Sequence, residues 1–229
     1  MIIVTTVKTL LALVVILLAN RVEAGVALGA TRVVYPAEQK QMSLGVSNSN
    51  PKDTFLIQSW VERIDGAKEN GFIITPPLFV MRGKKDNTLR IVDATNGKLE
   101  KDRESLFWIN VKAIPSLDKD QQKENTLQLA ITSRIKLFYR PGNLAIAPEE
   151  APAKLTFKRS GGQLIISNPT PYYLTISELS AGTRALTNAM APPMGVVTVE
   201  FASDLTGPIS YQTINDYGAL TAVMKATLQ

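Results

Sequence analysis

Short stretches of alternating apolar and polar residues recur along most of this chain. The longest runs from Asn125 to Pro141, where Leu127, Leu129 and Ile131 alternate with polar or small residues. A period of two places these three side chains on one face of a strand. The same segment then carries basic residues, at Arg134, Lys136 and Arg140. Such a strand is ordinarily half-buried in a sandwich, and an exposed edge would also let it pair with a partner chain.

Shorter alternating stretches, separated by turn residues, surround this segment on both sides. Their length and spacing predict an all-β protein built from sandwiches. Before the long strand we expect strands at Val26–Tyr35, Gln41–Val46, Phe55–Val61, Leu89–Val92 and Leu106–Ile114. After it we expect strands at Leu155–Phe157, Gln163–Ser167, Tyr173–Leu179, Val196–Phe201 and Ile209–Thr213.

The alternation weakens once, into small, acidic and proline residues at 143–152. Such a composition is typical of a linker, so we predict two β-domains, at 25–142 and 153–229. The long strand, at about 125–140, closes the first domain. Within that domain, Pro76-Pro77 predicts an edge or a switch between sheets, and the sequence leaves their cis or trans state open.

The first residues form a different pattern, an apolar run from Thr9 to Ala19 that follows Lys8. With Val22-Glu23-Ala24 behind it, this pattern predicts a signal peptide, residues 1–24, that is cleaved after Ala24. The run is too short to span a membrane. We therefore expect a soluble, exported protein that begins at Gly25.

Composition adds two constraints to this picture. The chain contains no cysteine, so it must hold itself together through its core without disulfides. Its formal net charge is +5, which falls to +4 without the signal peptide. This mild excess favours acidic partners, but no arginine-rich helix or aromatic-basic face indicates nucleic-acid binding.

Histidine is absent as well, which removes the imidazole- and thiol-based catalytic pairs and metal sites. Carboxylate pairs remain at Glu149-Glu150 and at Asp118 with Asp120, both in turn-like stretches where solvated charge is the ordinary explanation. A Ser-Lys dyad stays open, although no serine lies in a recognisable nucleophile setting. Binding is favoured over catalysis, with no catalytic, cofactor or metal residue assigned.

Arg32 on the first strand and Lys136 on the long strand are candidates for a shared anion site. Each alone is most simply a solvated strand residue. Together they could flank a cleft between the domains and clamp a carboxylate, because arginine offers a fork of donors and lysine a compact charge. Strand parity complicates this, since Lys136 faces away from Leu127, Leu129 and Ile131 unless a twist, a bulge or the ligand crosses the strand.

Several blocks of the sequence closely resemble the periplasmic pilus chaperones, in particular those of type 1 fimbriae. The blocks are GVALGATRVVYP, ITPPLF, DRESLFWINVKAIP, NTLQLAITSRIKLFYRP, NPTPYYLT and TINDYGALT, at residues 25–36, 74–79, 102–115, 125–141, 168–175 and 213–221. Glu100 departs from the family pattern, which usually has a small residue or proline there. The loop 116–124 is similar to the short-loop branch of the family, which serves rod-like pili.

The resemblance implies two immunoglobulin-like domains arranged like a boomerang, with a pilus subunit held in and beside the cleft. Arg32 and Lys136 match the pair that anchors the subunit's C-terminal carboxylate. Leu127, Leu129 and Ile131 match the residues that enter the groove of an incomplete subunit, which is donor-strand complementation. Glu104, Arg140 and Asp216 match an ionic network between the domains.

The resemblance also implies partners and a location. The expected partners are pilus subunits, including an adhesin, and an outer-membrane usher, and the expected compartment is the periplasm. No nucleotide or other cofactor is implied. The apolar strand leaves weak self-association of the free protein open.

Without the resemblance, the residues leave three other interpretations of the protein's function open. A pilus subunit or adhesin would also be all-β, but neither a cysteine pair nor an N-terminal donor extension is evident. A carbohydrate-binding sandwich is a second alternative, although Trp108 and Tyr211 are expected to pack within the sandwich rather than bind a sugar. An enzyme is the third.

Overall fold

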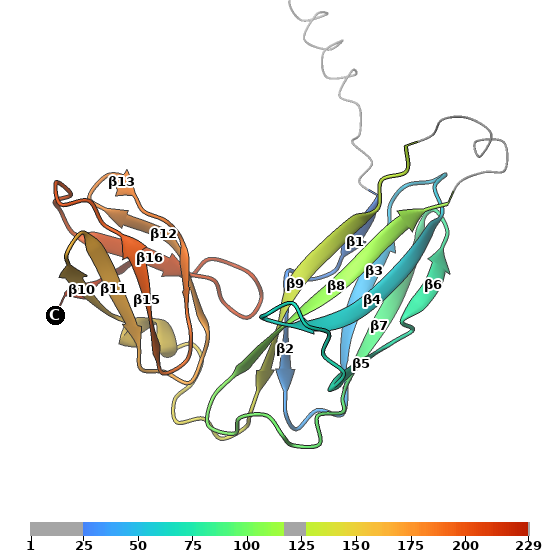
Figure 1. The fold of residues 1–229 in the computed structure, drawn as a ribbon, viewed down its shortest axis with the longest axis horizontal. Helices are drawn as coiled ribbons and strands as arrows, with labels where there is room; N and C mark the ends of the chain where they lie inside the picture. Colours follow the sequence, from blue (N-terminus) through green and yellow to red (C-terminus); the bar gives the residue numbers. More distant parts are fainter. Residues whose placement is uncertain (1–24, 117–126, 229) are drawn as a thin grey trace, which may run out of the picture.

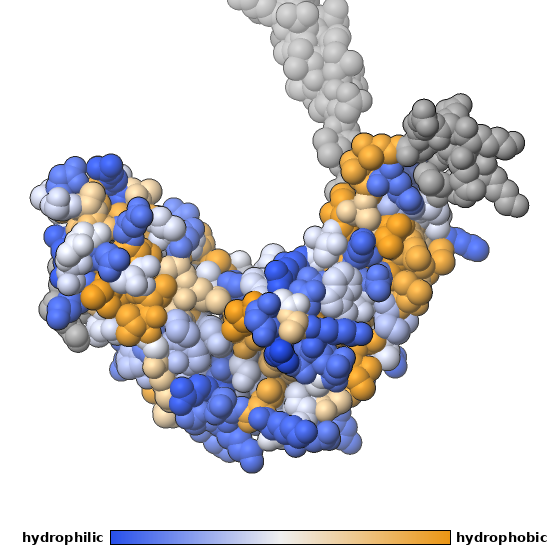
Figure 2. Space-filling view, viewed as in Figure 1, coloured by the Kyte–Doolittle hydropathy of each residue, from blue (hydrophilic) through white to orange (hydrophobic). Residues whose placement is uncertain are grey.

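The computed structural model describes residues 25–116 and 127–228, which fold into two β-sandwiches (Figure 1). The expected signal peptide and most of the loop at 116–124 lie outside the described residues. The sandwiches are set at an angle around an open, concave side, which is visible in both views (Figures 1 and 2). The predicted all-β, two-sandwich fold is confirmed.

The N-terminal sandwich consists of two facing sheets. The first has the order β1-β3-β7-β5, with β1 (Val26–Leu28), β3 (Met42–Asn48), β7 (Lys85–Asp93) and β5 (Phe72–Thr75). The second has the order β2-β9-β8-β4-β6, with β2 (Arg32–Pro36), β9 (Ile131–Arg140), β8 (Ser105–Pro115), β4 (Phe55–Arg63) and β6 (Leu78–Met81). All pairs are antiparallel except β2 with β9, which run parallel.

The chain passes from one sheet to the other between most consecutive strands of this domain, and two of these crossings bear on the predictions. The single strand expected at Val26–Tyr35 is divided, because β1 pairs with β3 in one sheet whereas β2 pairs with β9 in the other. Gly29 begins the crossing, and its main-chain N–H still donates to the carbonyl of Gly45 at 2.9 Å. Pro76-Pro77 makes the second crossing, from β5 to β6, so the predicted switch between sheets is confirmed. The Thr75–Pro76 peptide is cis.

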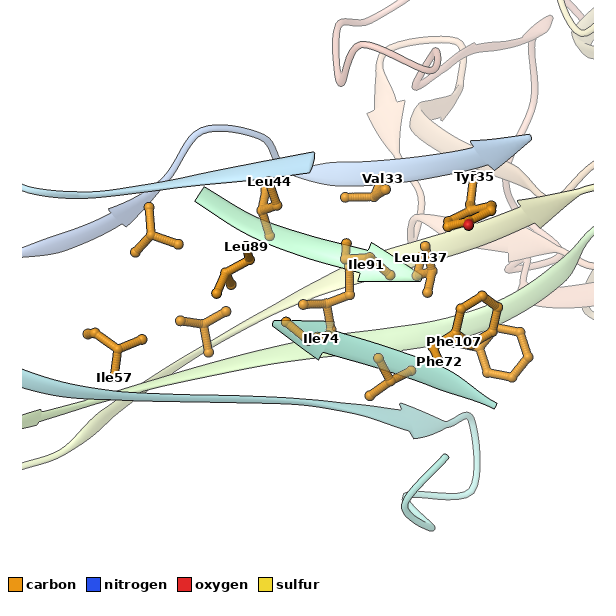
Figure 3. Packing of buried hydrophobic residues seen from close by; sticks show 14 of the residues in the cluster. Val33, Tyr35, Leu44, Ile57, Phe72, Ile74, Leu89, Ile91, Phe107 and Leu137 are labelled. Carbon is orange, nitrogen blue, oxygen red and sulfur yellow. The ribbon is translucent and has the colours of Figure 1, made fainter. Parts of the chain in front are cut away.

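The inward-facing residues of both sheets form one apolar core (Figure 3). Leu44, Ile57, Leu89, Ile91 and Leu137 are at most 1% exposed. Aromatic rings close the end of this core that lies nearer the second domain, and Tyr35, Phe72, Phe107 and Tyr139 contact one another there. Burial on this scale explains how the domain can do without disulfides.

The C-terminal sandwich is smaller and has its own core. One sheet has the order β15-β11-β10-β18, with β15 (Gly195–Glu200), β11 (Gln163–Asn168), β10 (Thr156–Ser160) and β18 (Thr227–Leu228). The other has β13 (Arg184–Ala185), β12 (Leu174–Ala181), β16 (Ile209–Thr213) and β17 (Met224–Lys225), and β14 (Ala189–Ala191) pairs with β12. Its core includes Phe157, Leu164, Ile166, Ile176 and Tyr211.

The segment between the domains is tied to the second sandwich. It ends in η2, a 3-10 helix at Ala151–Lys154. The hydroxyl of Tyr172 donates to the carbonyl of Ile146 at 2.6 Å, and that of Tyr211 donates to the carbonyl of Pro152 at 2.9 Å. The connection is therefore fixed by side chains of the second domain, so it is not a free tether.

Candidate functional site

Strand β9 links the core of the first sandwich to the concave side of the molecule. On one side it pairs with β8 from Ile131 to Tyr139, and on the other it pairs with β2 only from Lys136 to Arg140. Within the described residues, no strand pairs with Ile131–Ile135 on that second side. This part of the edge therefore keeps main-chain donors and acceptors available to another chain.

Three apolar side chains project from the beginning of this edge. Leu127, Leu129 and Ile131 are 81%, 68% and 71% exposed. Figure 2 shows apolar surface at this end of the N-terminal domain, beside the grey segment. Exposed leucine and isoleucine side chains grouped beside an open strand edge favour a site for a protein partner.

The regular strand is shorter than the sequence suggested. It begins at Ile131, which is paired with Ala113 of β8, and not near residue 125. Residues 127–130 are described without regular secondary structure, and residues 125–126 lie outside the described part. β8 ends at Pro115, which in this register would oppose residue 129, so before that point only another chain could supply ladder hydrogen bonds to an extended β9.

The two candidate cations are brought side by side. Arg32 and Lys136 are directly paired positions of the parallel strands β2 and β9. Lys136 Nζ donates to Thr175 Oγ1 at 3.3 Å, and Arg32 Nη1 donates to the main-chain carbonyl of Ile214 at 3.3 Å. Arg32 Nε is buried without a hydrogen-bond partner in the described structure. Two neighbouring cations that are incompletely satisfied favour an anion as the ligand here.

Electrostatics at this pair also favours an anionic ligand. Burial, and then the charge of Arg32, lowers the pKa of Lys136. Burial likewise lowers the pKa of Arg32, against the opposing charges of Asp216 and Glu104. A carboxylate placed between these groups would offset both the desolvation and the mutual repulsion.

The parity expected from the sequence is confirmed for Ile131, while Leu127 and Leu129 precede the regular strand. Lys136 points toward the second domain, where it contacts Thr175, whereas Leu137 lies in the core of the first domain. Ile131, the one member of the apolar row that lies within β9, and Lys136 are therefore on opposite faces of this strand. One ligand can reach both only if it runs along the strand's edge, because an edge borders both faces.

An ionic cluster in which Glu104 is buried and Asp216 is partly exposed joins the two domains next to the cation pair. Arg140 Nε lies 2.7 Å from Glu104 Oε1, and Arg140 Nη1 lies 2.6 Å from Asp216 Oδ2. The second oxygen of Glu104 accepts the main-chain N–H of Tyr173 at 2.8 Å. Burial raises the pKa of Glu104 despite its arginine partner. Against the effect of burial, the hydrogen bond from Arg140 to Asp216 and the charge of Glu104 raise the pKa of Arg140.

A cavity of about 240 Å³ lies between the domains at this cluster. Arg32, Arg140 and Phe138 line it from the first domain, and Tyr173 and Tyr217 line it from the second. The rings of Phe138 and Tyr173 have centroids 6.1 Å apart. The cavity therefore places aromatic surface beside the cationic groups at the junction.

Sequence reasoning missed the groups that the second domain contributes here. Thr175 and the carbonyl of Ile214 contact the two cations, yet nothing in the sequence relates them to Arg32 or Lys136. They lie within the blocks NPTPYYLT and TINDYGALT, which were recognised only as blocks. Their role depends on how the two domains pack together, and alternation within one domain does not reveal it.

The two aromatic residues weighed for sugar binding have different surroundings. Tyr211 is buried in the second core, as predicted. The prediction for Trp108 is wrong, because its ring lies half-buried on the outer face of β8, under the guanidinium of Arg134 at 4.5 Å. Even-numbered positions of β8 face outward, and a cation over the ring covers the apolar surface there.

Neither a cluster of metal ligands nor a helix able to cross a membrane is present among the described residues. Among residues 25–116 and 127–228, no three acidic residues gather as a metal site would require. In the same residues, no helix has the length and apolar character needed to cross a membrane.

Family models match both sandwiches. The model described as "Pili and flagellar-assembly chaperone, PapD N-terminal domain" matches residues 25–145. The model described as "Pili assembly chaperone PapD, C-terminal domain" matches residues 150–224. Together they cover both described cores and the candidate site between them.

Similar proteins and structures agree with these models. The chain is 62% identical to chaperone protein FimC of Escherichia coli strain K12, over 93% of this chain and 88% of that protein. The crystal structure of the periplasmic chaperone SfaE matches with a TM-score of 0.80 and 57% identity, over 89% of this chain and all of that one. The SafB chaperone of Salmonella enterica, solved in complex with the SafA pilin, matches with a TM-score of 0.80 and 31% identity, over 92% and 99%.

Proposed function

The chain belongs to the PapD family of pilus-assembly chaperones, and on that premise we propose that it captures a folding pilus subunit along the open edge of β9. The protein would lend this edge to a subunit whose own sandwich lacks a strand, and would then deliver the capped subunit to an outer-membrane usher. The observation that carries the proposal is the unpaired edge at Ile131–Ile135, with exposed leucines at one end and two cations at the other.

The apolar row supplies the affinity in this proposal. A subunit with a missing strand has an open groove, and Leu127, Leu129 and Ile131 would fill it with alternate side chains. Full burial is worth roughly 1.5 to 3 kcal/mol for each such side chain before ordering costs are subtracted. The same insertion would cover the subunit's apolar groove and strand edges, which otherwise promote aggregation.

The cation pair supplies the register. β2 runs parallel to β9 and begins at Arg32, opposite Lys136. A subunit strand that continues the line of β2 alongside Ile131–Ile135 must therefore end near Arg32. If it also runs parallel to β9, the group that meets Arg32 and Lys136 is its C-terminal carboxylate. The edge position also explains how one ligand reaches cations and leucines on opposite faces of β9.

The ionic cluster has a structural role in this proposal. Glu104, Arg140 and Asp216 would fix the angle between the domains, so that the groups of the second domain stay beside the cation pair. A buried ionic cluster can specify an arrangement even where its net stabilisation is small. The domain limits that fit this role are 25–142 and 153–229, with 143–152 between them.

Partners and location follow from the family. SafB is solved with a pilin, and the corresponding partners of this chain would be its own pilus subunits, including an adhesin. Export to the periplasm would use residues 1–24 as a signal peptide, cleaved after Ala24. We expect no nucleotide or other cofactor in capture, because burial and main-chain pairing provide the driving force.

Refolding tests the proposal directly. A denatured fimbrial subunit is diluted into the mature chain, wild type or Lys136→Ala, and the mixture is separated by size exclusion. We expect a one-to-one complex with wild type that is lost or strongly weakened with Lys136→Ala, because the carboxylate loses half of its anchor. Equal complex formation by both proteins would refute the anchor. Glycan binding that survives Lys136→Ala would instead support a carbohydrate-binding sandwich.

A further inference from the structure

Tyr217 is the most exposed large side chain near the cation pair. It is 95% exposed, and it lies on the turn that follows β16. Single exposed aromatic residues are common on protein surfaces and need no explanation by themselves. The turn that carries Tyr217 is unusual, because hydrogen bonds within the turn and contacts with the first domain both fix its backbone.

Hydrogen bonds within the turn fix its shape. The side-chain oxygen of Asn215 accepts the main-chain N–H groups of Tyr217 and Ala219, both at 3.0 Å. The main-chain N–H of Asn215 donates to the carbonyl of Ala219 at 2.9 Å, and that of Gly218 donates to the carbonyl of Asn215 at 3.0 Å. An asparagine that bonds its own following backbone stiffens a turn. The ring of Tyr217 is therefore carried on a rigid support.

The same turn is anchored to the first domain. Asp216 accepts two hydrogen bonds from Arg140, at 2.6 and 2.8 Å. Gly218 has a φ of 84° and lies so close to the hydroxyl of Thr31 that an added Cβ would collide with it. Figure 1 shows the loop after β16 reaching across the concave side toward the first sandwich. The turn therefore contacts the first domain both at Arg140 and at Thr31, the residue that precedes Arg32.

This turn brings Tyr217 to the place where a subunit strand would end. Tyr217 and Arg32 line the same cavity, and Arg32 donates to the carbonyl of Ile214 at the start of the turn. Thr31 marks the last position before β2, and a strand in line with β2 must stop there. The exposed ring of Tyr217, on a turn fixed beside this position, can contact the end of a strand that occupies the position.

We infer that Tyr217 is a positioning residue that covers the subunit's C-terminal carboxylate when it binds Arg32 and Lys136. The inference rests on the proposed function and adds a contact from the second domain. By excluding water and ions from one side of the site, the ring lowers the local dielectric and weakens salt screening of the charge pair. The cation pair binds the carboxylate, and the ring keeps the ionic contact effective at periplasmic salt.

A cycle of variants tests this inference. Complexes are formed between the mature chain, as wild type, Tyr217→Phe or Tyr217→Ala, and a fimbrial subunit with either its native C-terminus or a Gly-Ser-Gly extension. Dissociation constants are measured at low and high sodium chloride. We expect Tyr217→Ala to weaken binding of the native subunit about fivefold and to steepen its salt dependence. Tyr217→Phe should behave as wild type, because the ring provides the cover.

The extension separates a contact with the carboxylate from a general structural effect. It moves the carboxylate away, so Tyr217→Ala should then make no further difference. Ile73→Ala, at a 50% exposed position on β5, is the matched control and should change neither binding nor salt dependence. A loss with Tyr217→Ala that is equal for native and extended subunits, or no loss at all, would overturn the inference. If wild type bound both subunits equally, the carboxylate anchor itself would be refuted.

Discussion

The segment 127–140, which includes β9, carries one alternation of apolar and polar residues, but its two halves have opposite environments. In the second half, Leu137 is fully buried and Tyr139 is 8% exposed. In the first half, Leu129 and Ile131 occupy positions of the same parity and are 68% and 71% exposed. The second half is covered by the opposite sheet of its own sandwich, whereas the first half extends beyond it. The alternation therefore specifies which face is apolar. How far the facing sheet of the same sandwich extends decides which side chains on that face it covers.

The difference teaches that one strand can serve two cores. Leu137 packs with Leu44 and Ile91 of the facing sheet. Under the proposed function, Leu129 would occupy the equivalent place in a subunit's sandwich. The same physical chemistry, burial of alternate aliphatic side chains, then acts within the molecule in one half and between molecules in the other. Stability and capture should be separable by mutation along a single strand.

The largest expected effect is on the buried half. Leu137→Ala should lower the free energy of unfolding of the free protein by about 2 to 5 kcal/mol, because it removes buried methyl groups and leaves a cavity. Leu129→Ala should change it by no more than about 0.5 kcal/mol, since its side chain is largely exposed. Urea unfolding, followed by the fluorescence of the two tryptophans, both in the first domain, measures this difference.

The paired design makes this comparison decisive. Both variants make the same substitution on the same face of the strand segment and differ only in what covers the side chain. A clear loss of stability for Leu129→Ala in the monomer would mean that the row packs against the chain's own residues. The exposed half would then not be free to pair with a subunit.

The next effect is on capture, and it should come from the exposed half. Leu129→Glu places a charge at the centre of the apolar row, and burying that charge in a subunit's groove would be strongly unfavourable. We expect the refolding assay to give no one-to-one complex, while the unfolding curve of the free variant matches wild type. Leu127→Ala should weaken the complex less, because it removes methyl groups without introducing a charge.

The same substitution tests self-association. If wild-type chains pair through their free rows, ultracentrifugation will show dimers at high concentration that Leu129→Glu dissociates. Leu129→Glu with full capture of subunits would remove the row from the proposed mechanism, whatever the result for dimers.

The fold was largely predictable because its determinants are local. Alternating residues and turn residues placed the long strands β3, β4, β8 and β9. The division at Gly29 was missed, although the core-packing residues change there from even positions, Val26 and Leu28, to odd ones at Val33 and Tyr35. The bounds of the short strands β5 and β6 were not predicted, although the switch at Pro76-Pro77 between them was, since each strand has only four residues.

The candidate site was less accessible from residues alone. Arg32 and Lys136 become neighbours only through parallel pairing of two strands that lie more than a hundred positions apart. Their charges made them candidates for a shared anion site, and the resemblance to a family supported the pair, but periodicity did not place them together. The turn that carries Tyr217 is positioned by Arg140 and Thr31 of the other domain. Interdomain contacts of this kind depend on how two finished domains pack together, which no local pattern records.

The smallest effect should be a dependence on pH that only the cationic end of β9 produces. Because burial and Arg32 lower the pKa of Lys136, the unfolded chain binds more protons than the folded one between this lowered pKa and the ordinary value of lysine. Stability of the free protein should therefore rise slightly as pH increases through that window.

Capture should respond in the opposite direction, because a carboxylate binds only the protonated form of Lys136. Affinity for a subunit should be constant at lower pH and should fall as pH rises through the lowered pKa. Lys136→Arg stays charged throughout and should hold its affinity, so titration of both proteins from about pH 7 to 10 compares them directly. The apolar row of Leu127, Leu129 and Ile131 carries no titrating group and cannot produce this difference. If both proteins lost affinity in parallel, the decline would come from the subunit or from another group, and Lys136 would not be the residue that holds the carboxylate.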